Sequence, residues 1–250
     1  MRELRKEKIK QYIQQKKIVT INDLRALCPE VSLITIHRDL DHMAKNGEII
    51  KIRGGAKIAD DIMEPRFTER EYENQDAKMQ IARKMCQELV PNSSIFMDAG
   101  TTIYMMAKIF PDIPMNVFTV APNIAMELLH TTSKPTITMC SGNLNREHLM
   151  LTGYFTLEML KSINIDMAII GTSGFSLDCG FTCGVENQMM VKKLIMQRSR
   201  SVYILMDHSK LEHTFPFTFG TLEDVDYIVT DAPLPAPISE ALTANNVALL

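Results

Sequence analysis

The chain has 250 residues, of which 27 are Lys or Arg and 30 are Asp or Glu, so its formal net charge is −3. Apolar runs stay shorter than the about 18 residues of a transmembrane helix, and the charged start "MRELRKEKIK" predicts no signal peptide. Five irregularly spaced cysteines favour free thiols in a reducing cytoplasm. We therefore expect a cytoplasmic protein with no membrane partner, metal or cofactor.

The charge is unevenly distributed along the chain. Residues 1–58 hold 13 basic and 7 acidic side chains, a balance of +6, which leaves 14 basic and 23 acidic side chains, a balance of −9, for the remainder. Opposite charge on two segments indicates two kinds of partner, with a polyanion for the first. The predicted organisation is a small domain at 1–58, a polar linker at 59–75 and a larger domain at 76–250.

The first segment begins with two predicted helices. Ile9 and Ile13 repeat at helical spacing among Lys and Arg, which predicts an amphipathic helix. Thr20 is placed to cap a short second helix, with Asp23 three residues later. Pro29 disfavours helical geometry in the residue before it, so this helix should stop nearby.

A third helix is expected from the cap at Ser32 to the stop at Gly47. It contains "HRDL" (37–40), the string that opens the catalytic loop of protein kinases. A kinase also needs a glycine-rich loop before this string, yet no glycine precedes Gly47, and Ala44 stands where the catalytic-loop Asn belongs. The kinase interpretation is excluded. The apolar positions of the helix instead predict one buried stripe, made of Leu33, Ile36, Leu40 and Met43.

With that stripe buried, Thr35, His37 and Arg38 should face outward. A short helix, a tight turn and a third helix exposing Thr and Arg form the helix-turn-helix arrangement that enters the DNA major groove. Threonine can contact a thymine methyl group, and arginine can bind guanine O6 and N7. The alternative is a small basic three-helix bundle that contacts another protein.

The stretch "EIIKIRGGAKI" (48–58) alternates in the manner of a β-hairpin, with Gly54 and Gly55 as its turn. This hairpin would form a wing beside the three helices. Lys51, Arg53 and Lys57 would then lie near phosphates or the minor groove.

Residues 31–56, "VSLITIHRDLDHMAKNGEIIKIRGGA", resemble the DeoR family of bacterial transcriptional regulators, which usually has Arg where His37 stands. The resemblance implies a winged helix-turn-helix that binds a double-stranded operator. The residues expected at DNA are Ser32, Thr35, His37, Arg38, Lys51, Arg53 and Lys57.

In the larger segment, short β-type runs alternate with helical stretches, which predicts an α/β domain with a mostly parallel sheet. Helical spacing covers 77–89. The β-type runs are 94–100, 116–123, 136–142, 167–174, 202–209 and 227–231.

Most of these runs end in polar residues or glycine, and open parallel sheets bind ligands outside the carboxyl ends of their strands. Gly100 lets the backbone approach a ligand, and 101–102 open a helix whose free amides suit a phosphate. Lys210, or 192–193, would add positive charge, and Asp98 and Asp207 would accept from hydroxyls. This set suits a small phosphorylated polyol.

The stretches "DAGTT", "GTSG", "VKK" and "DHSK" are similar to the DeoR-type effector domain, whose fold is similar to ribose-5-phosphate isomerase. The resemblance implies a Rossmann-like sugar-phosphate sensor without turnover, in a repressor of a sugar-metabolism operon. By matching position, the ligand residues would be Asp98, Gly100, Thr101, Thr102, Asn123, Gly142, Gly174, Lys192, Asp207 and Lys210.

A homo-oligomer, dimer or tetramer, is also expected, because one recognition helix reads too few bases, and the larger domain would supply the association surface. Two rival functions remain. One is a sugar-phosphate isomerase with an accessory DNA-binding head, although the sequence reveals no compact group of paired carboxylates with a lysine at one strand end. The other is a protein–protein adaptor.

Overall fold

The computed structural model describes residues 2–16, 18–45, 49–52, 54–58, 64–132 and 135–250. The chain forms two compact units, Met1–Met63 and Glu64–Leu250. Each has its own hydrophobic core.

The described residues of the first unit form three helices and a three-stranded antiparallel sheet of order β1-β3-β2. Its elements are α1 (Arg2–Lys16), β1 (Ile18–Thr20), α2 (Ile21–Leu27), α3 (Leu33–Lys45), β2 (Ile49–Ile52) and β3 (Gly55–Ile58). The three helices and the hairpin were predicted, whereas β1 was not. Three residues directly before a helix cap carry too little alternation to indicate a strand.

Hydrogen bonds from side chains fix the residues at which α2 and α3 begin. The Thr20 hydroxyl accepts from the Asp23 N–H at 3.1 Å, and the Asp23 carboxylate accepts from the Thr20 N–H at 2.8 Å, so the predicted cap is a full capping box. Ser32 Oγ accepts from the Thr35 N–H at 3.3 Å at the start of α3.

The core of this unit is formed by apolar residues of the three helices and of β1, β2 and β3. Ile36, Leu40 and Met43 of α3 are fully buried, as predicted, but Leu33 is 40% exposed. The prediction was wrong for Leu33, which lies in the first turn of α3, the end that extends beyond the packed interior.

The wing differs from the predicted hairpin in its turn. Ile52 pairs with Gly55, so Gly55 belongs to β3 and Gly54, with φ of +82°, takes the left-handed position in the turn. Gly55 also pairs with Thr20 of β1. A Cβ atom at Gly55 would lie 2.0 Å from the Val19 carbonyl oxygen, so β1 can approach β3 here only because this residue is glycine.

The second unit is built on a seven-stranded parallel sheet of order β15-β14-β12-β9-β4-β5-β6. All six predicted runs form strands in it, so the α/β class is confirmed. Strand order runs outward in both directions from the β4–β9 pair, which makes this pair the topological switch point. The strands are β4 (Ser94–Met97), β5 (Asn116–Thr119), β6 (Thr136–Met139), β9 (Ile165–Gly171), β12 (Ser199–Leu205), β14 (Tyr227–Val229) and β15 (Ala248–Leu249).

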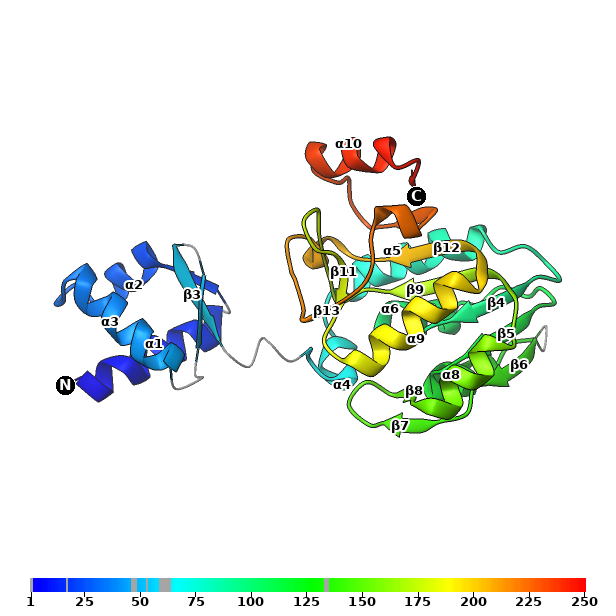
Figure 1. Ribbon diagram of the computed structural model, residues 1–250, viewed down its shortest axis with the longest axis horizontal. Helices are drawn as coiled ribbons and strands as arrows, with labels where there is room; N and C mark the ends of the chain where they lie inside the picture. The colour runs from blue at the N-terminus through cyan, green and yellow to red at the C-terminus, as the bar shows by residue number, and fades with distance from the viewer. Residues whose placement is uncertain (1, 17, 46–48, 53, 59–63, 133–134) are drawn as a thin grey trace. The chain divides into compact units, whose positions relative to one another are not determined.

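Helices cover both faces of this sheet and give a three-layer unit (Figure 1). One hydrophobic cluster joins the sheet to α5 (Gln75–Gln87), α6 (Thr101–Lys108) and α7 (Pro122–Leu128). The other joins the sheet to α8 (Tyr154–Lys161), α9 (Glu186–Gln197) and α10 (Ala236–Ala244).

Smaller elements connect the strands and helices of the main sheet. Two antiparallel sheets are made of β7 (Asn143–Asn145) with β8 (Met150–Thr152), and of β10 (Gly174–Ser176), β11 (Gly180–Cys183) and β13 (Phe217–Gly220). The described residues of this unit also include the 3-10 helices η2 (His208–Lys210) and η3 (Leu222–Asp224). Within the stretch 59–75 expected as a linker, 64–75 is folded and includes α4 (Phe67–Arg70), while 59–63 lies outside the described residues.

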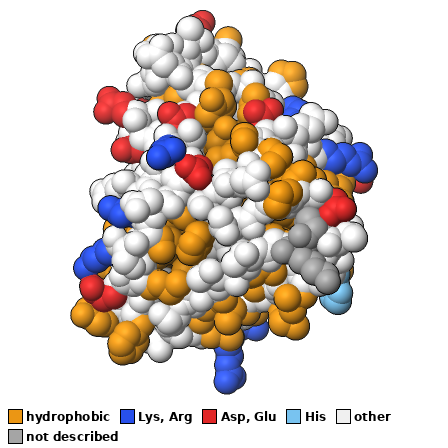
Figure 2. Space-filling model, turned by 90° about the vertical axis from the view of Figure 1, so that its right-hand side faces the viewer, with side chains coloured by type: hydrophobic (Ala, Val, Ile, Leu, Met, Phe, Trp, Pro, Cys, Tyr) orange, Lys and Arg blue, Asp and Glu red, His pale blue; other side chains and the backbone are white. Residues whose placement is uncertain are grey.

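The β6 edge of the sheet carries exposed apolar side chains. Met139 of β6 is 51% exposed, and Tyr154 and Phe155 at the start of α8 are 70% and 69% exposed. Figure 2 shows hydrophobic side chains spread between polar ones over one face of the molecule. In the described part of the chain, no helix is long and apolar enough to cross a membrane.

Candidate functional site

Two candidate sites lie in the two units, and the first is the outer face of α3. His37 and Arg38 are exposed, as is Ile34, and Thr35 is half-buried. Ser32 and Thr35 hydroxyls lie 3.1 Å apart at the helix start. Thus Thr35, His37 and Arg38 leave the apolar stripe as predicted.

The Asp of the "HRDL" string has a structural role. Asp39 is buried and accepts from Arg5 Nε of α1 at 2.7 Å, an ion pair that also raises the pKa of Arg5. The pair joins α1 to α3 and so fixes the orientation of the exposed face. Because the carboxylate of Asp39 is buried and paired with Arg5, it is not available for contact with DNA.

The wing residues are only partly described. Lys51 is exposed and forms a 2.7 Å ion pair with Asp41 of α3, so DNA would have to compete with this carboxylate. Lys57 lies in β3, without a described side chain, and Arg53 is outside the described residues.

The second candidate site is a pocket in the larger unit at the carboxyl ends of β4 and β9, the strands of the switch point, and of the neighbouring β12. Its unfilled space, with the open mouth included, is about 530 Å³. The pocket brings together six of the predicted ligand residues. These are Gly100, Thr101, Thr102, Lys192, Asp207 and Lys210.

A buried ion pair closes one side of this pocket. Lys192 of α9 donates to Asp98 Oδ2 at the end of β4 and to the Gly171 carbonyl oxygen at 2.6 Å. Asp98 is fully buried, and its Oδ1 atom has no hydrogen-bond partner among the described residues. Asp98 therefore lies behind the lining, where it orients Lys192 and retains one free acceptor.

A second group of polar residues lies at the end of β12. Asp207 is buried, and its Oδ1 accepts from the Ser209 N–H at 2.9 Å and from Asn74 Nδ2 at 3.3 Å, while Oδ2 has no described partner. Lys78 of α5 is buried and donates to the carbonyl oxygens of Arg70 and Glu73. Burial, together with the charge of Lys210, lowers the pKa of Lys78 to about 8.

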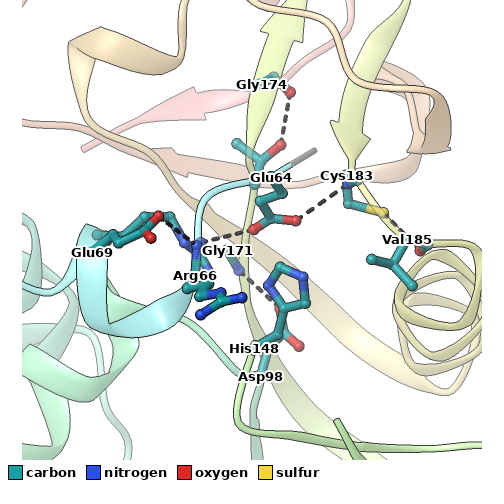
Figure 3. Close-up of polar contacts among 12 residues, drawn as sticks. Glu64, Arg66, Glu69, Asp98, His148, Gly171, Gly174, Cys183 and Val185 are labelled. Atoms are coloured by element: carbon teal, nitrogen blue, oxygen red, sulfur yellow. Dashed lines mark hydrogen bonds and ion pairs between the residues drawn. The ribbon is translucent and has the colours of Figure 1, made fainter. Parts of the chain in front are cut away.

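Three titratable lining residues, Glu64, Arg70 and His148, were missed by the sequence prediction. Glu64 Oε1 pairs with Arg70 at 2.8 Å and its Oε2 accepts from the Gly184 N–H at 3.2 Å. His148 lies in the turn between β7 and β8, next to Glu64 (Figure 3), and its Nδ1 has no described partner.

Electrostatics distinguishes these two buried groups. Burial alone would raise the pKa of Glu64, but Arg70 and His148 outweigh it and hold the pKa below its ordinary value. Burial lowers the pKa of His148, against the attraction of Glu64. At neutral pH the pocket therefore holds an ionised Glu64 beside a neutral imidazole ring.

Three further predicted ligand residues lie outside the lining. Asn123 begins α7, with both side-chain polar atoms buried and without described partners. Gly142 is a turn residue with φ of +139°, where a Cβ atom would lie 2.0 Å from Thr156 Oγ1. Gly174 of β10 lies against the His213 carbonyl, which a Cβ atom would approach to 2.3 Å. At the two glycines a close approach of the chain to itself accounts for the residue type.

The described part of the chain brings no three His, Cys, Asp or Glu side chains together in a metal-binding arrangement. The site's chemistry is that of a small polar ligand: cations and helix amides for an anion, and free carboxylate oxygens for hydroxyl groups.

Comparison with known proteins identifies both units. The DeoR-like helix-turn-helix domain matches residues 5–61, and the DeoR C terminal sensor domain matches residues 73–232. The glycerol-3-phosphate regulon repressor of Escherichia coli (strain K12) is 28% identical over 220 residues, covering 88% of this chain and 87% of that protein. The HTH-type transcriptional repressor GlcR of Bacillus subtilis (strain 168) is 29% identical over 240 residues, covering 96% and 92%.

Solved structures similar to this chain include ribose 5-phosphate isomerase A from Methanocaldococcus jannaschii, with 13% identity, a TM-score of 0.41 and coverage of 56% of this chain and 55% of that one. The translation initiation factor eIF-2B of Pyrococcus horikoshii OT3 has 11% identity, a TM-score of 0.48 and coverage of 69% of each chain. Because the sensor-domain match alone spans more than half of the chain and the helix-turn-helix match covers its first unit, this protein belongs to the DeoR family of transcriptional regulators.

Proposed function

We propose that this protein is a cytoplasmic repressor of a sugar-metabolism operon, released from or held on its operator by a phosphorylated sugar bound in the pocket of the larger unit. The observation that carries the proposal is the pocket at the switch point of the sheet. The amino end of α6, the cation of Lys210 and the free carboxylate oxygen of Asp207 meet there.

These groups suit the two ends of a phosphorylated polyol. The free amides at the start of α6 and the cation of Lys210, both in the lining of the pocket, favour a phosphate. The unpartnered Oδ2 of Asp207 in the lining favours a hydroxyl donor, because a buried acceptor without a donor costs about 1–3 kcal/mol. The relative in Escherichia coli is named for a regulon of glycerol 3-phosphate, itself a phosphorylated polyol.

The first unit supplies the operator contact in this proposal. Thr35 and Arg38 on the outer face of α3 would read bases, and Ser32, His37, Lys51, Arg53 and Lys57 would contact the DNA around them. A second copy of the chain would double the number of bases read. The adaptor alternative predicts no steep fall of DNA affinity with salt, whereas operator binding requires one.

Catalytic turnover is not part of this proposal, although the pocket does place an Asp–Lys pair and a second carboxylate together, which sequence reasoning did not expect. A general base should have a pKa near the working pH. Glu64 has its pKa held below the ordinary value and is occupied by Arg70 and Gly184. Asp98 is fully buried behind Lys192.

The test is a thermal-shift screen of the full chain against phosphorylated sugars and polyols, glycerol 3-phosphate included. A ligand of the native pocket raises the melting temperature in a concentration-dependent way. The same compound must change affinity for an operator selected from random duplexes, and NMR must detect no new product. A compound that stabilises the protein without changing operator affinity contradicts the regulatory proposal.

A further inference from the structure

The segment 64–70, here called the strap, begins the larger unit and forms part of the pocket wall. In the chain it follows residues 59–63, which join it to the first unit. Phe67 anchors the strap: its N–H donates to the Glu147 carbonyl oxygen at 2.7 Å, and its buried ring packs edge-on against Tyr104 of α6 at 5.7 Å between centroids. Its two ends, Glu64 and Arg70, face the pocket.

Those two ends hold each other by a single charged contact. Glu64 and Arg70 are joined at 2.8 Å, with 4% and 13% of their side chains exposed. Arg70 Nε is buried and has no acceptor among the described residues. A buried guanidinium with a free N–H at the wall of a pocket has capacity for a further anion, and Arg prefers to bind a phosphate through two N–H groups.

An anion that reaches Arg70 also approaches Glu64, whose carboxylate is next to the ring of His148 (Figure 3). Two anions cannot share this buried guanidinium at low cost, because like charges repel strongly where water is scarce. The Gly184 N–H, 3.2 Å from Glu64 Oε2, is a weaker partner than Arg70 and does not hold the carboxylate alone.

We infer that the strap transmits the state of the pocket to the DNA-binding unit: an anionic ligand replaces Glu64 at Arg70, and the freed Glu64 alters the segment that leads to residues 59–63. The inference rests on the proposed function and names its coupling contact. Arg70 is the ligand-sensing side chain, and Glu64 is a positioning residue that keeps the strap closed in the empty protein.

The test uses hydrogen exchange of the full chain at the Arg70 and Glu71 amides, which donate to Arg66 and Phe67 carbonyls in the closed strap. The variants are Glu64→Gln, which keeps shape but loses charge, and Arg66→Gln as a matched control. Arg66 is on the same strap, and its pair with Glu147 is exposed and off the pocket. The probes are inorganic phosphate and glycerol 3-phosphate, against chloride of equal ionic strength.

In the wild-type protein, either probe should accelerate exchange at these amides, by about tenfold at saturation, because a charged hydrogen bond in a buried site is lost. Glu64→Gln should exchange at that faster rate without a probe and respond little further, and Arg66→Gln should behave as wild type. The ratio of operator affinities with and without ligand should approach one in Glu64→Gln alone.

Slow hydrogen exchange at the Arg70 and Glu71 amides of Glu64→Gln without a probe would overturn the inference. So would wild-type amides whose exchange neither probe accelerates. The proposed function has a separate failure. A sugar phosphate that raises the melting temperature and changes operator binding while the strap stays closed refutes the strap alone. A strap that opens in a chain without operator affinity refutes only the proposed regulator.

Discussion

At the scale of single residues, Arg38 is the side chain on which base reading depends most. It is exposed on α3, where its guanidinium can bind a guanine in the major groove. Replacing Arg38 by Ala should weaken operator binding by about 1–3 kcal/mol and relax specificity at one base pair. Fluorescence anisotropy against matched and mismatched duplexes measures both effects.

Arg200 gives the control, because its exposed guanidinium lies on the larger unit. Arg200→Ala should leave operator affinity unchanged. Equal affinities for wild type and Arg38→Ala would remove Arg38 from the reading surface.

The buried Asp98–Lys192 pair sets a second prediction. Lys192→Met leaves a fully buried carboxylate without its cation, which should lower the free energy of unfolding of the larger unit by about 3–5 kcal/mol. Adding Asp98→Asn should restore part of this loss, because the uncompensated charge is removed. Urea titration of the two variants tests this, and a double variant less stable than Lys192→Met would contradict it.

His148 makes stability depend on pH. Burial is the largest effect and lowers the pKa of His148 from 6.5, and the charges of Arg70 and Lys192 lower it further. The carboxylates of Glu64 and Glu147 act in the opposite direction but do not offset these effects. As the pH falls below about 6.5, the His148 side chain is protonated in the unfolded chain before it is protonated in the folded protein. The free energy of unfolding therefore decreases until the pH has also passed the lower pKa of the folded state. His148→Gln should flatten the pH dependence of the melting temperature between about pH 7 and pH 5.

His130 offers the comparison, since its side chain is exposed at the end of α7. His130→Gln should keep the wild-type profile. A His148→Gln profile as steep as the wild-type profile would assign the acid sensitivity to other groups.

At the scale of elements, the wing has two adjacent glycines with different roles. A Cβ atom at Gly54 has open space around it but requires a positive φ, so Gly54→Ala should cost about 1 kcal/mol. At Gly55 the Cβ atom would collide with the Val19 backbone, so Gly55→Ala should separate β1 from β3. Hydrogen exchange at the β3 amides should rise far more for Gly55→Ala, and equal rises would refute the close approach.

What could be predicted from sequence follows from the length and burial of each element. The strands at the sheet centre, such as β9 and β12, each contain a continuous run of four apolar residues, 167–170 and 202–205, and this hydrophobic pattern alone indicates them. The three-residue strands β7 and β10 hold too few positions to show a pattern.

For a related reason, only part of the pocket lining could be predicted from the sequence. Residues that directly follow a strand, such as Thr101 or Asp207, can be assigned to its carboxyl end from sequence alone. Glu64 and Arg70 lie in a charged stretch that has the composition of a linker, and their burial arises from an ion pair that only the folded chain creates. Glu64 and Arg70 are six residues apart, which is not the three- or four-residue spacing of paired side chains on a helix, so no signal for their ion pair is present in the sequence.

At the scale of the whole molecule, association through the β6 edge is the remaining prediction. Tyr154 and Phe155 are exposed aromatic side chains beside that edge, a composition typical of association surfaces. The double variant Tyr154→Ser with Phe155→Ser should lower the sedimenting mass and weaken operator binding together. Tyr72→Ser, at an equally exposed tyrosine of the same unit, should change neither. An unaltered mass in the double variant would place the association surface elsewhere.

The separate cores of the two units have an evolutionary consequence. The interior of the first unit is formed by residues between Ile9 and Ala56, and the two clusters of the second begin at Ile81 and Phe96. Among the described residues, the core clusters of the two units share no side chain, so gene fusion can exchange one unit without repacking the interior of the other. A hybrid gene joined within 59–63 would give a new pairing of operator and metabolite in one recombination event.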